Sequence, residues 1–432
     1  MEGLPSEVLR YILREATFVE GGFSYPDKVD TREQERPALL RMTEAMRIKC
    51  DISLVSKRFH ALGDEFLLEI VHIGHQKHIG ALRTVLRQPR KAGLTRGWWC
   101  RHLIVNLRQH DIDWSHGKVS LWGLIPSCPR LEDLRCFLFH TVPPGEIRLH
   151  RRTLELYRIP GALCQTIATT LGPSLRYLHF GDHAEISLDL ATRLLPHLKR
   201  LEVCRFDRLF APHLASIEDD PRWQLDKRYI EDEYPVDETI AKEYKPVTDQ
   251  AQWPTNPDET VIVPALKIFK ARSFAADFGK WQAPNLQEVI VGFDRDCTEE
   301  TCLTTMRKAL VPHATKISRL TFEGGGGGCL WVILGMLPRL EHIRFPLQSM
   351  IFNEVLTHPH MKLTSLVIIL EPLDEEDLPE ALSNIQENVA GGLLPSLRTI
   401  DLEGTKDVGR GVVVEAQNAF SGLGVSVAVT YA

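Results

Sequence analysis

The segment Pro338-Arg339-Leu340-Glu341-His342-Ile343-Arg344-Phe345 contains the short pattern that decides the fold. Its form is Pro-x-Leu-x-x-Leu-x-Leu, with other apolar residues allowed at the leucine positions. The alternation at its end is that of a short β-strand, in which successive side chains point to opposite faces. The second and third apolar residues therefore point into a core, and the residues between them point outward.

Similar segments recur along most of the chain. From Leu175 to Leu198 and from Leu266 to Leu397, the first apolar residues of successive copies lie 20 to 34 residues apart. A recurring unit of this size is the sequence signature of a repeat protein. The clear copies have their three apolar residues at Leu131, Leu134 and Cys136; Leu175, Leu178 and Phe180; Leu198, Leu201 and Val203; Leu266, Phe269 and Ala271; Leu286, Val289 and Val291; Ile317, Leu320 and Phe322; Leu340, Ile343 and Phe345; Leu363, Leu366 and Ile368; and Leu397, Ile400 and Leu402.

Helical stretches separate these strands at residues 165–171, 188–195, 301–310 and 330–337, where apolar residues recur at helical spacing. Strands that alternate with helices predict an α/β fold with a parallel sheet. The pattern resembles that of leucine-rich-repeat proteins, which implies a solenoid with a curved parallel sheet and convex helices. A doubly wound α/β enzyme would also alternate strand and helix, but it would not explain the Pro-x-Leu-x-x-Leu-x-Leu phasing.

Two N-terminal segments carry a second pattern. Leu4-Pro5-x-Glu7-Val8-Leu9-x-x-Ile12-Leu13 predicts a short amphipathic helix, and Leu54-Val55-Ser56-Lys57-Arg58-Phe59 follows later. Together they resemble the F-box, a small all-α module that binds a Skp-type adaptor. By that resemblance, their apolar residues are divided between the module's own core and the adaptor groove. The adaptor-binding residues implied are Leu4, Pro5, Val8, Leu9, Ile12, Leu13, Leu54, Val55 and Phe59.

The resulting domain prediction is an F-box-like module over residues 1–75, with an insertion at 17–50, followed by a repeat domain over 76–432. The alternative for the N-terminal module is a helical cap that closes the first repeat. A second, acidic and proline-rich insertion is expected at about residues 207–262, because Glu218 to Glu259 holds thirteen acids and five bases. Such an insertion is either a tolerated loop or part of a binding face.

Signatures of chemistry are weak. His72, His75 and His78 lack the additional ligands of a zinc site. Cys297 and Cys302 lack a second pair, and Gly324–Gly328 lacks the Lys-Ser/Thr of a phosphate loop. No nucleophile signature is present either. We therefore expect no enzyme, and no catalytic residue, metal or cofactor.

The composition points to the cytoplasm or the nucleus. The formal charge of -6 favours neither nucleic acid nor an anionic membrane as partner. The N-terminus lacks an export signal, and the nine scattered cysteines suit a reducing compartment. Residues 83–101 combine arginines with Trp98 and Trp99. This combination is typical either of a solvated connector or of a segment that binds acidic peptides or stacks on nucleic-acid bases.

The family resemblance implies a function. This function is that of a substrate-recognition subunit of an SCF-type ubiquitin ligase. Such a subunit binds a Skp-type adaptor, and through the adaptor a cullin scaffold. Its concave face binds a protein substrate. The alternatives are an interaction scaffold without adaptor and a small-molecule sensor with a pocket under the 207–262 insertion. Outward-pointing strand residues of mixed charge favour a protein ligand over a phosphate backbone. The candidate substrate contacts are His179, Glu202, Lys270, Ile290, Arg319, Arg344 and Asp401.

Overall fold

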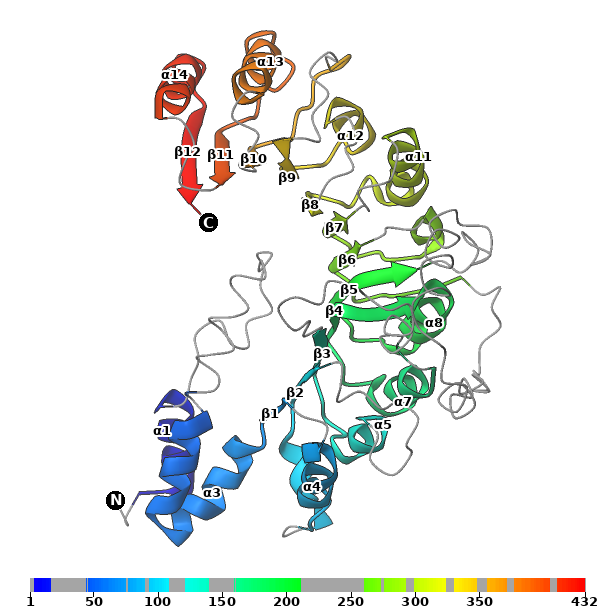
Figure 1. Ribbon diagram of the computed structural model, residues 1–432, viewed down its shortest axis with the longest axis vertical. Helices are drawn as coiled ribbons and strands as arrows, with labels where there is room; N and C mark the ends of the chain where they lie inside the picture. The colour runs from blue at the N-terminus through cyan, green and yellow to red at the C-terminus, as the bar shows by residue number, and fades with distance from the viewer. Residues whose placement is uncertain are drawn as a thin grey trace, which may run out of the picture. The chain divides into compact units, whose positions relative to one another are not determined.

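The computed structural model describes most of the chain (Figure 1), which divides into two compact units. The first unit holds the described residues up to Ala184 together with His197–Val203, and the second holds Glu185–Pro196 and the described residues from Cys204 onward. The predicted division between residues 75 and 76 stays a prediction. The described residues are 4–16, 44, 46–74, 77–89, 93–108, 121–139, 159, 161–210, 260–272, 276–292, 299–323, 330–347, 356–370, 377–404 and 410–431.

The first unit begins with helices and continues as strands separated by helical segments. Its strands are hydrogen-bonded in the order β1-β2-β3-β4, and each of these neighbouring pairs is parallel. Its elements are α1 (Ser6–Ala16), a helix at 46–55, α3 (Lys57–Leu67), β1 (Ile70–Ile73), α4 (Lys77–Leu86), η2 (Arg96–Trp99), β2 (His102–Arg108), α5 (Leu121–Leu124), η4 (Ile125–Ser127), β3 (Asp133–Phe139), α7 (Gly161–Leu171) and β4 (Tyr177–Ser187).

The second unit repeats the same alternation, with strands in the order β5 to β12 and parallel pairing from β6 to β12. Its elements are α8 (Leu188–Leu194), η5 (Leu195–His197), β5 (Val203–Phe210), β6 (Ile268–Arg272), η7 (Ala276–Lys280), β7 (Glu288–Gly292), α11 (Glu299–Leu310), η8 (Val311–His313), β8 (Arg319–Glu323), α12 (Leu330–Met336), β9 (His342–Pro346), β10 (Ser365–Leu370), α13 (Leu378–Ala390), β11 (Thr399–Gly404), α14 (Arg410–Ser421) and β12 (Ser426–Tyr431).

The strand register aligns the repeat pattern across each sheet. In the first unit, Leu103, Leu134 and Leu178 are directly paired. In the second unit, one continuous row consists of the second apolar residue of each copy, and each member of it is buried. Burial of this apolar row is the main stabilising contribution that every strand makes. The row is Phe269, Val289, Leu320, Ile343, Leu366, Ile400 and Val427.

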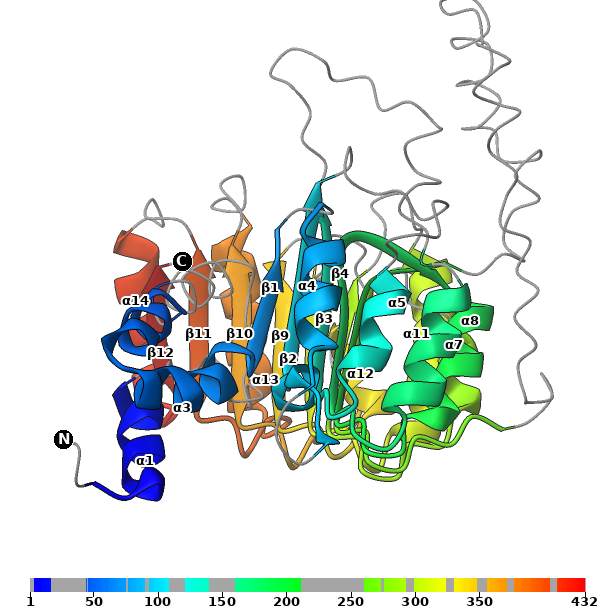
Figure 2. The ribbon, with the colours of Figure 1, turned by 90° about the horizontal axis from the view of Figure 1, so that it is seen from below.

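Helices cover one face of the sheet in each unit. In Figure 1, α4, α5 and α7 lie on one side of β1–β4, and α11 to α14 lie on one side of β7–β12; Figure 2 gives the view at right angles. Helix α7 shows why: Leu163, Ile167 and Leu171 lie four residues apart on one face and are fully buried. Helices pack about 8–10 Å apart but strands only about 4.8 Å, a difference that favours curvature toward the helix-free side within each unit.

The predicted α/β class and the parallel sheet are confirmed. The strands follow one another in chain order, as in a solenoid, rather than in the reordered sequence of a doubly wound sheet. The predicted helices at 165–171, 188–195, 301–310 and 330–337 correspond to α7, α8, α11 and α12.

The two predicted insertions are described only at their ends. In the 17–50 segment, residues 46–50 belong to the helix that continues to residue 55, and residues 17–43 lie outside the described ranges. In the 207–262 segment, residues 207–210 complete β5 and Ile262 forms an isolated bridge with Gln282. Residues 211–259 lie outside the described ranges.

Candidate interaction surfaces

The N-terminal helices divide their apolar residues between a core and the surface. Leu9 and Leu13 of α1 are buried against Leu62 and Phe66 of α3, with Leu4, Ile52 and Phe59 packed partly against this cluster. The other apolar side of α1 is open, because Val8 and Ile12 remain 42% and 43% exposed. Leu54 and Val55, at the end of the 46–55 helix, are 81% and 70% exposed. We refer to the exposed side chains of Val8, Ile12, Leu54 and Val55 together as the N-terminal apolar surface.

Polar contacts join the two N-terminal motifs across the long segment that separates them in sequence. Arg58 Nη2 donates a hydrogen bond to the backbone carbonyl of Leu4. Ser56 Oγ accepts a hydrogen bond from the backbone N–H of Phe59 and thereby caps α3. Arg10 donates two hydrogen bonds to the carboxylate of Glu65, from Nε at 3.1 Å and from Nη2 at 3.0 Å. These hydrogen bonds raise the pKa of Arg10. These contacts hold α1 in a defined position on α3.

We expect the Arg10–Glu65 pair to contribute only about 0.5–1 kcal/mol to stability, because 42% of the Arg10 side chain is exposed and solvent screens the pair. A double-mutant cycle of Arg10→Met and Glu65→Gln, read by thermal unfolding, measures the coupling. The coupling should shrink when NaCl is raised from low concentration to about 1 M, since the screening length falls. A coupling that does not change with salt would contradict this estimate.

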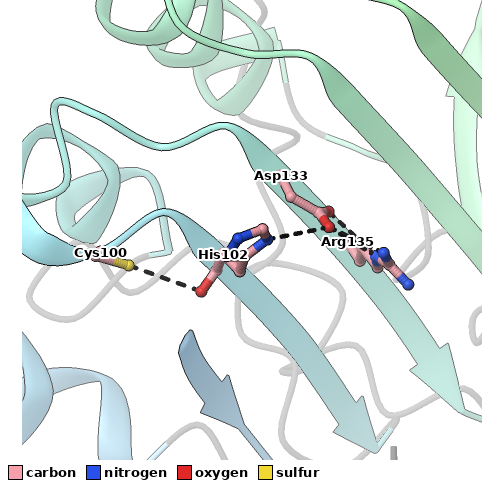
Figure 3. A network of polar contacts seen from close by, with 4 residues as sticks. All are labelled: Cys100, His102, Asp133 and Arg135. Carbon is pink, nitrogen blue, oxygen red and sulfur yellow. Dashed lines mark hydrogen bonds and ion pairs between the residues drawn. The ribbon is translucent and has the colours of Figure 1, made fainter. Parts of the chain in front are cut away.

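The helix-free face of the first unit carries a buried ionic network. Asp133 of β3 accepts hydrogen bonds from Arg135 Nε and Nη2, the latter at 2.9 Å, and lies 3.4 Å from His102 Nδ1 of β2 (Figure 3). Burial raises the pKa of Asp133, but the neighbouring Arg135 and His102 outweigh it and lower the pKa to about 2. The Arg135 guanidinium also lies 4.5 Å over the ring of Tyr177 on β4. The network therefore ties three adjacent strands together.

Two of the predicted substrate contacts lie in this first unit, and neither is an open side chain. His179 is 2% exposed and packs edge-on against Phe137 and Tyr177. Glu202 accepts a hydrogen bond from Arg176 Nε at 2.7 Å. The side chains of both predicted contacts are engaged in packing or pairing.

In the second unit, Lys270 bridges strands. Its Nζ lies 3.0 Å from Asp207 of β5 and 2.9 Å from Glu323 of β8. Burial lowers the pKa of Lys270, but the two carboxylates outweigh it, so the pKa is raised. The contact with Glu323 spans β7 from one side to the other, beside Ile290 and Gly292. Ile290, a predicted substrate contact, lies beside this bridge and is fully buried.

A second bridge of the same geometry lies further along the sheet. Arg344 of β9 donates from Nε to Glu403 of β11 at 2.8 Å, and the contact spans β10 at Val367 and Ile369. Asp401 lies in register with Val367 and is half-buried. Burial and then the neighbouring Glu403 raise the pKa of Asp401. We call the surface formed by Arg344, Val367, Ile369, Asp401 and Glu403 the Asp401 face.

The structure thus brings Arg344 and Asp401 together, while Arg319 lies beside another acid. Arg319 is 45% exposed and its Nη1 is 3.9 Å from Glu288. Sequence reasoning missed the acids that complete these sites, which are Asp133, Asp207, Glu323 and Glu403. The signal available was their outward position in the strand pattern, but the pairing partners lie up to 63 residues apart, as Asp207 and Lys270 do, and depend on register.

The other features that the sequence suggested lie partly outside the described ranges. Within the described ranges, no three His, Cys, Asp or Glu side chains converge as metal ligands. His75, Cys297 and Gly324–Gly328 lie outside those ranges. The guanidinium of Arg130 stacks on Trp98 at 5.1 Å, and Trp99 lines a groove of about 350 Å³ together with Tyr11 and Phe66. No disulfide joins the described cysteines, and all of them except Cys50 are buried.

Among the described residues, no helix combines the length and the apolar character needed to cross a lipid bilayer. Comparison with protein-family models and with curated proteins gave no match to this sequence.

Proposed function

We propose that this chain is the substrate-recognition subunit of an SCF-type ubiquitin ligase, with an F-box-like N-terminal module and leucine-rich repeats. The N-terminal apolar surface would bind a Skp-type adaptor, and through it a cullin scaffold. The helix-free face of the repeats would bind a protein substrate. The chain itself catalyses no step in this scheme, because its contribution is to hold the substrate close to a charged ubiquitin-conjugating enzyme.

The observation that carries this proposal is the division of the motif residues between core and surface. Leu9 and Leu13 are buried, whereas Val8 and Ile12 of the same short helix are exposed. Leu54 and Val55, from the second motif, are exposed as well. Exposed apolar side chains on helices that share one small core are typical of a surface that a partner covers. A cap that only closes the repeat array requires no such surface.

The repeats support the second half of the proposal. Their helix-free face bears both acids and bases, including Lys270, Arg344 and Asp401, on a hydrogen-bonded parallel sheet. Surfaces of mixed charge suit protein partners, because complementary charges select the partner and set its orientation. The sheet provides a fixed frame, which is the property that recognition of a large substrate needs.

Binding of the purified full chain to a purified Skp-type adaptor, measured by calorimetry, tests the proposal. The variant Val8→Asp/Ile12→Asp should bind at least about 100-fold more weakly, since it places two charges in a desolvated apolar contact. Both residues are exposed, so the fold should be retained, and circular dichroism checks this. Leu9→Asp is less informative because Leu9 belongs to the core.

The matched control is Val414→Asp, a change of the same kind at an exposed valine of α14 in the second unit. It should leave adaptor binding unchanged. If the parent chain does not bind the adaptor, the ligase role is lost and the interaction-scaffold alternative takes its place. Equal binding by the parent and by Val8→Asp/Ile12→Asp would also overturn the proposed docking surface.

A further inference from the structure

The two cross-strand bridges of the second unit differ at one position. In each, a cation on one strand reaches an acid two strands further on, from Lys270 to Glu323 and from Arg344 to Glu403. The residue of the far strand that is in register with the cation is Thr321 in the first bridge and Asp401 in the second. The first bridge therefore forms with a neutral residue at this position, so the Asp401 carboxylate is not needed to hold such a bridge together.

The charges on the Asp401 face do not balance. Arg344 supplies one positive charge, and it donates its hydrogen bond to Glu403 rather than to Asp401. Within the part of the chain that the structure describes, no hydrogen bond or ion pair to a cation compensates Asp401. The carboxylate is half-buried, and burial penalises its charged form, as the raised pKa reflects. A cation brought by a ligand would compensate that charge.

The surroundings of Asp401 suit a side chain with an apolar stem and a cationic tip. Val367 lies in register on one side of Asp401 and Ala428 on the other, and Ile369 lies two residues further along β10. Val367 and Ile369 are half-buried, and Ala428 is exposed. Lysine and arginine cover apolar surface with their methylene stems while the charged group reaches beyond it. The apolar surface of Val367, Ile369 and Ala428 lies next to the uncompensated carboxylate of Asp401. It is therefore complementary to a lysine or arginine side chain.

We infer that the Asp401 face binds a lysine or arginine side chain of a basic, extended segment in a protein partner, with the cation pairing with Asp401 between Val367 and Ala428. This inference rests on the proposed function in one respect, since it gives the class of substrate segment that the repeat surface would receive. The segment is basic because the acids of this face outnumber its single arginine, so an acidic segment would add a third negative charge beside Asp401 and Glu403.

The test uses the full chain and a fluorescein-labelled pentapeptide with one lysine between two valines, followed by fluorescence anisotropy. A second peptide carries acetyl-lysine, which keeps the stem and removes the charge. The lysine peptide should bind about tenfold more tightly than the acetyl-lysine peptide. Equal binding of the two peptides, or no binding of the lysine peptide up to about 1 mM, overturns the inference.

Two variants of the chain give effects of opposite sign. Asp401→Thr reproduces the neutral residue of the first bridge and should weaken lysine-peptide binding about tenfold, with no loss of thermal stability, because threonine suits a strand better than aspartate does. Arg344→Met frees a second carboxylate and should strengthen binding. A purely structural role for these residues would lower binding in both variants, and that result would overturn the inference.

The charge-matched control is Glu387→Gln, because Glu387 is an exposed acid of α13 on the helix side of the sheet. It changes the net charge as Asp401→Thr does and should not affect peptide binding. An equal effect of both substitutions would show general attraction of cations and would reject a defined site. The peptide assay contains no adaptor, so its outcome is independent of whether the N-terminal apolar surface binds one.

Discussion

Replacing Asp133 with asparagine should lower the free energy of unfolding at pH 7 by about 2–3 kcal/mol. The substitution keeps the size of the side chain but removes the charge that faces Arg135 and His102. The Arg135 side chain is only 15% exposed, so its guanidinium would lose its principal counter-charge in a place that water reaches poorly. Chemical denaturation of parent and variant, followed by circular dichroism, measures the difference.

The effect of Asp133→Asn should also depend on pH. The pKa of Asp133 is about 2 in the folded chain against an ordinary value of 3.8, so the charged form is favoured by folding. The contribution of the charged Asp133 carboxylate to the free energy of unfolding is complete above its ordinary pKa. It is lost as the pH falls through the pKa of Asp133 in the folded chain. The parent and the variant should therefore converge in stability as pH is lowered from about 4 toward 2. A difference that stays constant over this window would show that charge is not the cause.

Two further variants separate the ion pair from general effects of substitution. Asp133→Asn/Arg135→Met removes both partners and should recover part of the loss, because an unpaired buried charge costs more than a missing pair. Asp189→Asn breaks an ion pair with Arg193 on the surface of α8, where the aspartate side chain is 50% exposed. That change should cost at most about 0.5 kcal/mol. A comparable loss in Asp189→Asn and Asp133→Asn would contradict the role assigned to burial.

The repeat pattern predicted the class of fold because it acts locally and many times over. Leu340, Ile343 and Phe345 define a strand and a turn within six residues, and each further copy of the pattern predicts the same strand and turn. The register then follows, because only one alignment buries Ile343 beside Leu320 and Leu366. Helix α12 was predicted from its own apolar spacing for the same reason.

The polar sites were harder to predict because they depend on distances between strands rather than on spacing within one. Arg344 and Asp401 were chosen as outward-pointing residues, and they do share a surface. Nothing in the local sequence around Arg344 shows that it reaches Glu403 across an intervening strand. Likewise Ile290 has the outward position of its strand, yet it is fully buried beside the bridge from Lys270 to Glu323.

For the N-terminal motif, the sequence predicted the helix but not which of its apolar residues are buried. Helical spacing predicted one apolar stripe through Val8, Leu9, Ile12 and Leu13, but it did not divide the stripe between core and surface. The division arises from the packing of Leu9 and Leu13 against α3, whose position in turn depends on contacts such as that of Arg58 with Leu4. These contacts join residues 54 positions apart, which no periodicity can reveal.

Replacing Gly97 with alanine should lower the free energy of unfolding by about 3 kcal/mol or more. A Cβ atom at this position would lie 1.7 Å from the carbonyl oxygen of Ser127 and 3.3 Å from that of Leu86. Both contacts are with backbone, so no side-chain rotation can relieve them, and η2 would have to move away from η4. Since these turns precede β2 and β3, the shift would disturb the stacking of two consecutive repeats.

The same substitution at Gly335 provides the control, with an effect of opposite sign. Gly335 lies within α12, and a Cβ atom there would meet no atom within 4 Å. Alanine favours a helix over glycine by about 1 kcal/mol, so Gly335→Ala should raise the thermal unfolding midpoint while Gly97→Ala lowers it. If Gly97→Ala were neutral, the close approach of η2 to η4 would have to be abandoned, and with it the tight stacking of the first repeats.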